Sequence, residues 1–296
     1  MTVAMTMTTS AGTAKAWGGE GRGRESAPRA FFFDVQGRAL FGAWHGARSP
    51  RALLLMCPPL LHEHVRSYRF FSHLADRFAA AGVACLRFDY AGTGDSAGAD
   101  EAFTPRRAHV DIAGAARELR RRGGEGLPLV LMGIRASALL LPGAIEAVAP
   151  DALWLWQPEC DGADYLARVE AQDLSARSDP RRYPARPLPR PADADELMGF
   201  RVAGELRRHL AQVRLGAALP PSLPLAVAAR AGEPTSGLAP QATYLLPEAV
   251  ADWAWEIDFP RVIQARAAAG VVDALVSALP ARQAEGGAAR GRVAHA

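Results

Sequence analysis

The chain has 296 residues, 49% of them hydrophobic, and its 34 Lys or Arg residues nearly balance its 31 Asp or Glu residues. A chain of this length buries most of its apolar surface, which favours one large domain or one domain with a lid. The formal net charge of +3 is too small to indicate a nucleic-acid partner. No stretch approaches the roughly 18–20 apolar residues that span a bilayer, and residues 1–29 lack the apolar core of a secretory signal. We therefore expect a cytoplasmic protein without a membrane span.

Both ends of the chain are poor in large apolar residues. Residues 1–29 are rich in Gly, Ala and Thr, and residues 281–296 have a similar character. Such segments bury too little apolar surface to fold, so both are predicted to be disordered tails. The folded domain is then expected over residues 30–280.

Three cysteines, Cys57, Cys85 and Cys160, are too widely spaced to form a metal site, and their odd number argues against a disulfide framework. Cys57 and Cys85 lie inside apolar runs, where cysteine behaves as a small buried hydrophobic residue. Cys57 also lacks a neighbouring base that could activate it. We expect no cofactor and no metal ion.

Strand and helix patterns alternate from residue 31 to residue 156. A hairpin is expected where residues 31–35 and 40–44 flank Gln36-Gly37. Further strands are predicted over 52–57, 83–88, 127–132 and 152–156, and helices over 67–81, 105–122 and 136–148. Thr104 and Pro105 have the residue types expected at the start of the second of these helices. This alternation predicts right-handed βαβ units and an α/β sheet.

The alternation stops after Trp156. Residues 157–222 contain helical patterns over 165–176 and 196–212, joined by a segment rich in Pro and Arg over 178–191. An insertion of this kind commonly forms a lid, and we interpret residues 157–222 as one. Strands are then expected over 223–229, 243–246 and 253–257, followed by a final helix over 266–279.

This order of elements resembles the α/β-hydrolase fold, a mainly parallel central sheet flanked by helices with a helical lid. Residues 88–98 resemble the D-x-x-G-x-G-x-S loop that follows the fourth strand in that superfamily, beginning at Asp89. The apolar strand that ends at Cys57, with Pro58-Pro59-Leu60 after it, takes the place that normally contributes an oxyanion-hole amide.

The strand over 127–132 runs into Gly133-Ile134-Arg135-Ala136-Ser137. In α/β hydrolases this strand ends in G-x-S-x-G, a strained turn that exposes a serine nucleophile. Here the nucleophile position holds Arg135, whose guanidinium stays protonated and cannot attack an acyl carbon. Ser137 takes the place of the second small residue. We favour a packing role for Ser137, with a displaced nucleophile as the alternative.

The other triad members should follow the nucleophile in the order acid, then histidine. Glu233 is the nearby carboxylate after the strand predicted over 223–229. No histidine lies between His209 and His295, although the triad histidine belongs near residues 255–262. The Ser-His-Asp mechanism therefore lacks both its nucleophile and its base.

His62-Glu63-His64 follows the Pro58-Pro59 turn, at the rim of the expected pocket. Two histidines beside an acid could supply a general base, but no third ligand with metal-site spacing follows them. The alternative is that these polar residues cap a helix that begins near Ser67.

The sequence is similar to a group within this superfamily that is labelled serine aminopeptidase-like or exosortase A system-associated hydrolase. The similarity covers roughly residues 30–280 and rests on the stretches 58–59, 86–96, 133–135, 156–166 and 195–200. The elbow of that group often reads G-x-R-x-G, which Arg135 fits and Ser137 does not. The resemblance implies a hydrolase label that is inherited from the fold, and a fold alone does not establish a function.

Two functions follow as expectations. The first is hydrolysis or binding of a small acyl, ester or peptide-type substrate. In that case the amides of Leu60 and Ala136 would stabilise an oxyanion, Arg135 would hold an anion, and His62 would activate water.

The second is a catalytically inactive binding module, a pseudoenzyme, in which Arg135 holds an anionic ligand or partner. A buried arginine needs a partner, and pairing with a carboxylate of the chain itself would make Arg135 structural. The candidate internal partners are Glu63, Asp89, Asp95 and Glu159.

Overall fold

The computed structural model describes residues 28–181, 195–235, 237–250 and 261–279. Nearly all of the two predicted tails, the predicted strand over 253–257 and most of the Pro/Arg-rich segment over 178–191 lie outside the described residues. All structural statements below refer to the described residues.

The described residues form one eight-stranded sheet with the order β1-β2-β4-β3-β5-β6-β9-β10. Its strands are β1 (Arg29–Val35), β2 (Arg38–His45), β3 (Ala52–Cys57), β4 (Val83–Phe88), β5 (Leu129–Ile134), β6 (Ala152–Trp156), β9 (Leu225–Ala229) and β10 (Ala242–Leu245). Pairing is antiparallel between β1 and β2 and between β2 and β4, and parallel elsewhere. Every residue of β3, β4, β5 and β6 is buried. Continuous apolar runs produce this pattern because helices cover both faces of such strands, and the predicted α/β sheet is confirmed.

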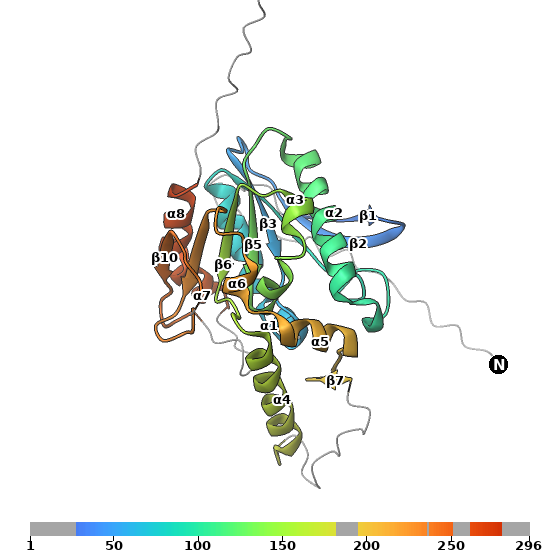
Figure 1. Cartoon of the computed structure of the whole chain (residues 1–296). Helices are drawn as coiled ribbons and strands as arrows, with labels where there is room; N and C mark the ends of the chain where they lie inside the picture. The colour runs from blue at the N-terminus through green and yellow to red at the C-terminus, as the bar shows by residue number, and fades with distance from the viewer. Residues whose placement is uncertain (1–27, 182–194, 236, 251–260, 280–296) are drawn as a thin grey trace, which may run out of the picture.

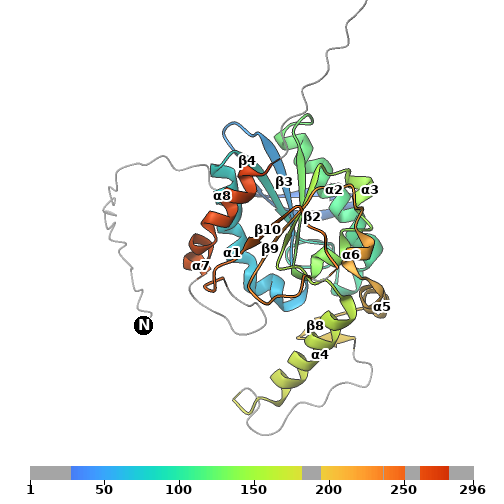
Figure 2. The ribbon, with the colours of Figure 1, turned by 60° about the vertical axis from the view of Figure 1, so that its left-hand side comes forward.

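Helices pack on both faces of the sheet (Figures 1 and 2). On one face, α1 (Leu61–Ala80) contacts α7 (Arg261–Ala267) and α8 (Ala269–Ser277). On the other face, α2 (Pro105–Gly123) contacts α3 (Ile145–Val148). The two faces bury separate apolar clusters, one built around Phe70 and Phe78 and the other around Ile112. The predicted start of α2 is correct, since the Thr104 hydroxyl accepts a hydrogen bond from the Arg107 amide.

The first long helix begins earlier than the sequence predicted. Leu60 is extended (φ −96°, ψ 157°) and α1 starts at Leu61 rather than near Ser67. Pro58 and Pro59 disfavour helical backbone in the residues that precede them. The helix can therefore begin only after Pro59, and it does so at Leu61. His62, Glu63 and His64 therefore lie in the first turn of α1 and do not cap a later helix.

The helix predicted over 136–148 is two short pieces. The 3-10 helix η2 (Arg135–Leu140) is followed by a break, and α3 comes after it. Pro142 cannot continue a helical hydrogen-bond ladder, and Gly143 packs where a Cβ would collide with the His109 ring. The break therefore follows from this Pro-Gly pair.

The insertion between β6 and β9 contains helices and a small hairpin. Its elements are α4 (Gly162–Ser178), β7 (Glu196–Leu197), β8 (Phe200–Arg201), α5 (Gly204–Gln212) and α6 (Leu215–Ala218). The helix predicted over 196–212 is wrong at its start, because Met198 (φ 54°) and Gly199 (φ 85°) form a turn between β7 and β8. Helix α4 extends away from the sheet, with α5 beside its base (Figures 1 and 2).

The predicted final helix over 266–279 is also divided, between α7 and α8. Of the apolar residues expected to face inward on this helix, Val271, Val272, Leu275 and Val276 are buried and Leu279 is half-buried. The short 3-10 helix η1 (Asp100–Ala102) precedes α2 and lies against β8.

Candidate functional site

Arg135 lies at the apex of a sharp turn between a strand and a helix. Strand β5 ends at Ile134, and η2 begins at Arg135. The φ of Arg135 is 54°, in the left-handed region that non-glycine residues rarely occupy. At Gly133 a Cβ would lie 2.9 Å from the Cα of Ala138, so a side chain does not fit there. The turn has the backbone shape of a nucleophile elbow, with arginine in place of the nucleophile.

The Arg135 guanidinium is bound on all sides by acceptors of the chain. Its Nε and Nη2 donate to Oε1 of Glu63, at 3.2 and 3.0 Å. Nη2 also lies 2.7 Å from Oε1 of Glu159, and Nη1 donates to the Gln157 carbonyl oxygen at 3.1 Å. Arg135, Glu63 and Glu159 are all buried. Two of the four candidate carboxylates are thus its partners, while Asp89 and Asp95 lie elsewhere.

The two buried carboxylates, Glu63 and Glu159, are balanced by two guanidinium groups, those of Arg135 and Arg168. Burial by itself would lower the pKa of Arg135, but the carboxylates of Glu63 and Glu159 outweigh burial and raise that pKa above its usual value. Glu159 has a second cation, since Nη2 of Arg168 lies 2.6 Å from its Oε1. A buried ion pair is stable only when its partners and hydrogen bonds are complete. We define Arg135, Glu63, Glu159 and Arg168 as the elbow ion cluster.

Glu233, the candidate triad acid, is joined to this cluster through Gln157. The Gln157 side chain donates from Nε2 to Oε1 of Glu233 at 2.7 Å. Oε2 of Glu233 accepts from the Arg230 amide at 2.9 Å. The carboxylate thus lies at the expected end of β9, but it holds an amide side chain where a triad would place an imidazole.

Ser137 is fully buried between two strand ends. Its Oγ accepts from the Ile134 amide at 2.8 Å and lies within hydrogen-bonding distance of the carbonyl oxygens of Cys57 (2.9 Å) and Ile134 (2.8 Å). These contacts tie the elbow to the end of β3. They support the packing role that we favoured for Ser137.

His62 and His64 have different environments although both lie in the first turn of α1. His62 is buried, and neither of its ring nitrogens has a hydrogen-bond partner among the described residues. Burial, together with the positive charges of Arg66 and Arg135, lowers the pKa of His62 to about 4. His62 is therefore neutral near pH 7. His62 lines neither of the cavities described below, so it does not contact a ligand bound in them.

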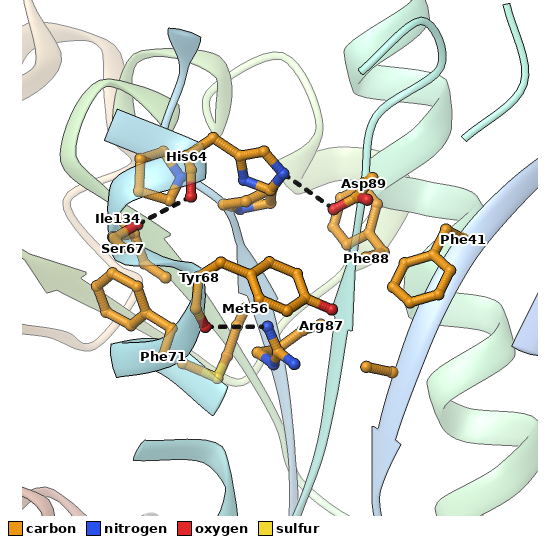
Figure 3. A pocket seen from close by; sticks show the side chains of 13 residues that line it. Phe41, Met56, His64, Ser67, Tyr68, Phe71, Arg87, Phe88, Asp89 and Ile134 are labelled. Atoms are coloured by element: carbon orange, nitrogen blue, oxygen red, sulfur yellow. Dashed lines mark hydrogen bonds and ion pairs between the residues drawn. The ribbon is translucent and has the colours of Figure 1, made fainter. Parts of the chain in front are cut away.

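His64 has the carboxylate partner that His62 lacks. Its Nε2 lies 3.1 Å from Oδ1 of Asp89, which follows β4 (Figure 3). Oδ2 of Asp89 accepts from the Asp95 amide at 3.0 Å. Sequence reasoning chose His62 as the candidate base and treated Asp89 as a candidate partner of Arg135. The signal for the His64–Asp89 pair is that both residues follow the carboxyl ends of β3 and β4, which are adjacent parallel strands.

Two cavities meet at His64. The smaller, of about 20 Å³, is lined by His64, Tyr68, Arg87 and Asp89 together with apolar side chains of β2, β3 and α1 (Figure 3). This volume holds about one water molecule. The larger, of about 180 Å³, lies between the start of α1, the loop over 90–103 and the turn before β8. His64 and Pro59 line both cavities.

The larger cavity is mostly apolar, with a few polar groups. Its apolar lining is provided by Leu60, Leu61, Val65, Tyr90, Phe103 and Phe200. Thr93, Asp100 and Arg201 add polar groups. Nε of Arg201 pairs with Oε1 of Glu101 at 3.2 Å, which joins β8 to η1. A cavity with this mixture of side chains has the composition of a small-molecule site.

The two candidate oxyanion amides are placed differently. Leu60 lines the larger cavity, while Ala136 is fully buried in η2 and lines neither cavity. Within the described residues, no side chain caps the N-terminus of α1. Its first-turn amides therefore retain the partial positive charge of a helix N-terminus beside Leu60.

Among the described residues, no group of three or more His, Cys, Asp or Glu side chains has the geometry of a metal site. Cys57, Cys85 and Cys160 are free thiols. Burial raises the pKa of Cys57 and of Cys85, so neither is a thiolate near neutral pH. None of the helices in the described part of the chain has the length and apolar character needed to span a membrane.

No protein-family model and no curated protein matches this sequence. Solved structures nevertheless share its fold. Est1E from Butyrivibrio proteoclasticus, with ferulic acid bound, has a TM-score of 0.57 and 16% identity, covering 84% of this chain and 100% of that chain. A soluble variant of monoglyceride lipase from Saccharomyces cerevisiae, in complex with a substrate analogue, has a TM-score of 0.55 and 11% identity, over 85% and 96% of the two chains.

A third similar structure is XC6422 from Xanthomonas campestris, described as an α/β serine hydrolase without lid, with a TM-score of 0.50 and 15% identity over 86% and 98% of the two chains. Together with the strand order and the flanking helices, these similarities show that the chain has the α/β-hydrolase fold. At such low identities the likeness establishes the fold and not the activity.

Proposed function

We propose that this protein binds a small acyl- or ester-type molecule in the larger cavity and forms no covalent acyl–enzyme at the elbow. The observation that carries this proposal is the pairing of Arg135 with Glu63 and Glu159 at the nucleophile position. A guanidinium cannot attack an acyl carbon, and one that is fixed by two carboxylates does not leave the elbow open to a substrate. The binding function therefore belongs to the neighbouring cavity, which His64 lines.

The size and lining of the cavity support a short acyl ligand. At about 180 Å³ the cavity is smaller than typical drug-sized pockets, and most of its lining is apolar. Thr93 and Arg201 can hydrogen-bond to ester or carboxyl oxygens. The similar structures contain ferulic acid in one case and a substrate analogue of a lipase in another, which is consistent with this ligand class.

The anionic-ligand alternative has less support. It required a guanidinium of Arg135 that is open to a ligand, and this guanidinium is engaged by Glu63, Glu159 and the Gln157 carbonyl oxygen. The proposal also places the chain in the serine aminopeptidase-like, exosortase-associated group, because residues 133–135 have the G-x-R elbow. It further takes the protein to be cytoplasmic.

A fluorophosphonate probe tests whether the elbow contains an activated serine. We expect intact-mass analysis of the treated protein to show no adduct, because Arg135 has replaced the nucleophile and Ser137 bonds to buried backbone groups. A serine esterase treated in parallel shows that the probe is reactive. A stoichiometric adduct on Ser137, located by peptide mapping, would overturn the proposal and restore a serine hydrolase with a rearranged site.

Filling the cavity tests where the ligand binds. Val65 lines the larger cavity and its side chain is 66% exposed, so Val65→Trp adds bulk at the rim without overpacking the core. We expect Val65→Trp to weaken binding of ethyl butyrate at least about tenfold, measured by isothermal titration calorimetry, a loss of about 1.4 kcal/mol.

The matched control is Arg69→Trp, an exposed position of the same helix that lines neither cavity. This variant should bind ethyl butyrate as the unmodified protein does. Equal binding by both variants, or no binding by the unmodified protein, would refute the assignment of the ligand to this cavity.

A further inference from the structure

We propose that His64 and Asp89 form a general-base pair that activates a water molecule for hydrolysis of an ester bound in the larger cavity. The inference rests on the proposed function, because it takes the ligand to lie in that cavity. It assigns the chemical step to a histidine of α1, an element in which a hydrolase triad does not place its histidine. In this proposal the elbow residue Arg135 holds the site together through its ion pairs and takes no part in the chemical step.

The geometry of the pair fixes which nitrogen of His64 is basic. Oδ1 of Asp89 accepts only, so Nε2 of His64, 3.1 Å away, carries the proton. The lone pair of Nδ1 is then available to take a proton. The ring of Tyr68 packs edge-on against the imidazole, with ring centroids 6.2 Å apart, and supports its orientation.

Asp89 is itself held by neighbouring residues. Its Oδ2 accepts from the Asp95 amide, and its backbone carbonyl accepts from the Ser96 hydroxyl at 2.6 Å. The same hydroxyl accepts from the Phe41 amide of β2 at 2.9 Å. Gly94, with φ 54°, approaches so closely that a Cβ would collide with the Asp89 carboxylate. A carboxylate fixed in this way can orient an imidazole, as the acid of a catalytic pair must.

Both cavities reach His64, so the water and the ester can meet beside its imidazole. The smaller cavity has room for about one water molecule among polar groups that include Asp89 and Arg87 (Figure 3). The larger cavity has room for the ester. His64 and Pro59 are the residues that line both. His62 lines neither cavity, which distinguishes the two histidines.

The proposed step balances without any other reactant. Nδ1 of His64 takes a proton from water while the water oxygen bonds to the acyl carbon and the carbonyl electron pair moves onto oxygen. Leu60 and Leu61, at the N-terminus of α1 that no described side chain caps, line the larger cavity, and the first-turn amides would stabilise this developing negative charge. The bond from carbon to the alcohol oxygen then breaks, and the leaving oxygen takes the proton from His64. The products are one carboxylic acid and one alcohol, and His64 is neutral again.

The experiment compares turnover and binding in three forms of the full chain. The unmodified protein should hydrolyse p-nitrophenyl butyrate, and His64→Gln should lower kcat by about 10²–10⁴-fold, the range for loss of a general base. Binding of ethyl butyrate should stay within about twofold in His64→Gln, which also shows that the variant is folded. His73→Gln is the matched control, because His73 is exposed on the same helix and should leave both quantities unchanged.

The outcomes separate this inference from the proposed function. An unmodified protein that binds ethyl butyrate but does not hydrolyse the p-nitrophenyl ester retains the binding function and overturns the general-base pair. Turnover that His64→Gln leaves unchanged overturns it as well, and so does loss of binding together with turnover, which would make His64 a ligand contact only. Acylated protein in a quenched reaction contradicts direct attack by water. Absence of binding in the unmodified protein refutes the proposed function itself.

Discussion

Replacing Arg135 with methionine is expected to lower the free energy of unfolding by about 3–5 kcal/mol, the usual cost of leaving a buried charge without its partner. Arg135 is 8% exposed, and its loss leaves Glu63 buried without a cation. Methionine has a similar length and also bears a Cβ, so the strain at φ 54° is nearly the same before and after the change. Urea unfolding at pH 7.5, followed by circular dichroism, measures the difference.

Two further variants test whether the loss of stability comes from the carboxylate that Arg135 leaves unpaired. In Arg135→Met/Glu63→Gln the orphaned carboxylate is gone, so part of the lost stability should return, as a coupling of about 0.5–3 kcal/mol between the two positions. Arg168→Met removes the other cation of Glu159, but Arg168 is 39% exposed, so its effect should stay near or below about 1 kcal/mol. Similar stabilities for Arg135→Met and the unmodified protein would show that Arg135 is not a structural anchor, and the anionic-ligand alternative would regain support.

The elbow ion cluster explains how a strained turn persists without a nucleophile. In a hydrolase, the positive φ of the elbow aims a serine at the substrate. Here it aims a guanidinium at Glu63 in the first turn of α1 and at Glu159 after β6. The ion pairs thus connect three elements at the carboxyl edge of the sheet. Strain of about 1–3 kcal/mol at one residue persists where surrounding contacts determine its conformation, and these contacts provide that constraint.

Local patterns in the sequence were sufficient to predict most of the sheet. The run over 52–57 is continuously apolar and the run over 83–88 is apolar except for Arg87, and both are buried strands. The predicted strand over 127–132 is shifted, because β5 extends to Ile134 and includes Gly133, which a propensity argument excludes from a strand. Two predicted helices were wrong because a turn interrupts the helical pattern, at Met198 and at Pro142.

The candidate site was harder to predict because its contacts join distant parts of the chain. The partners of Arg135 could be narrowed to four carboxylates, but choosing Glu63 and Glu159 required knowing that α1 begins at Leu61. That start turns Glu63 toward the elbow and His64 toward Asp89. An error of less than two turns in one helix boundary therefore decided which histidine was taken as the candidate base.

Lowering the pH from 7.5 to 4 is expected to destabilise the fold, with about 3 kcal/mol at most contributed by His62. Burial and the charges of Arg66 and Arg135 lower the pKa of His62 from 6.5 to about 4 in the folded protein. Below pH 6.5 the unfolded chain therefore binds a proton that the folded protein does not. The contribution of His62 to the free energy of unfolding is fully retained above pH 6.5 and falls by up to about 1.4 kcal/mol per pH unit until pH 4.

Urea unfolding at a series of pH values, compared between the unmodified protein and His62→Leu, isolates this contribution. Because His62→Leu has no titrating group at that position, its stability should fall less steeply between pH 6.5 and 4. Burial also lowers the pKa of His45, to about 4, so the variant should retain part of the slope. Equal slopes in His62→Leu and the unmodified protein would mean that His62 is accessible to protons in the folded state, contrary to its burial beside Arg135.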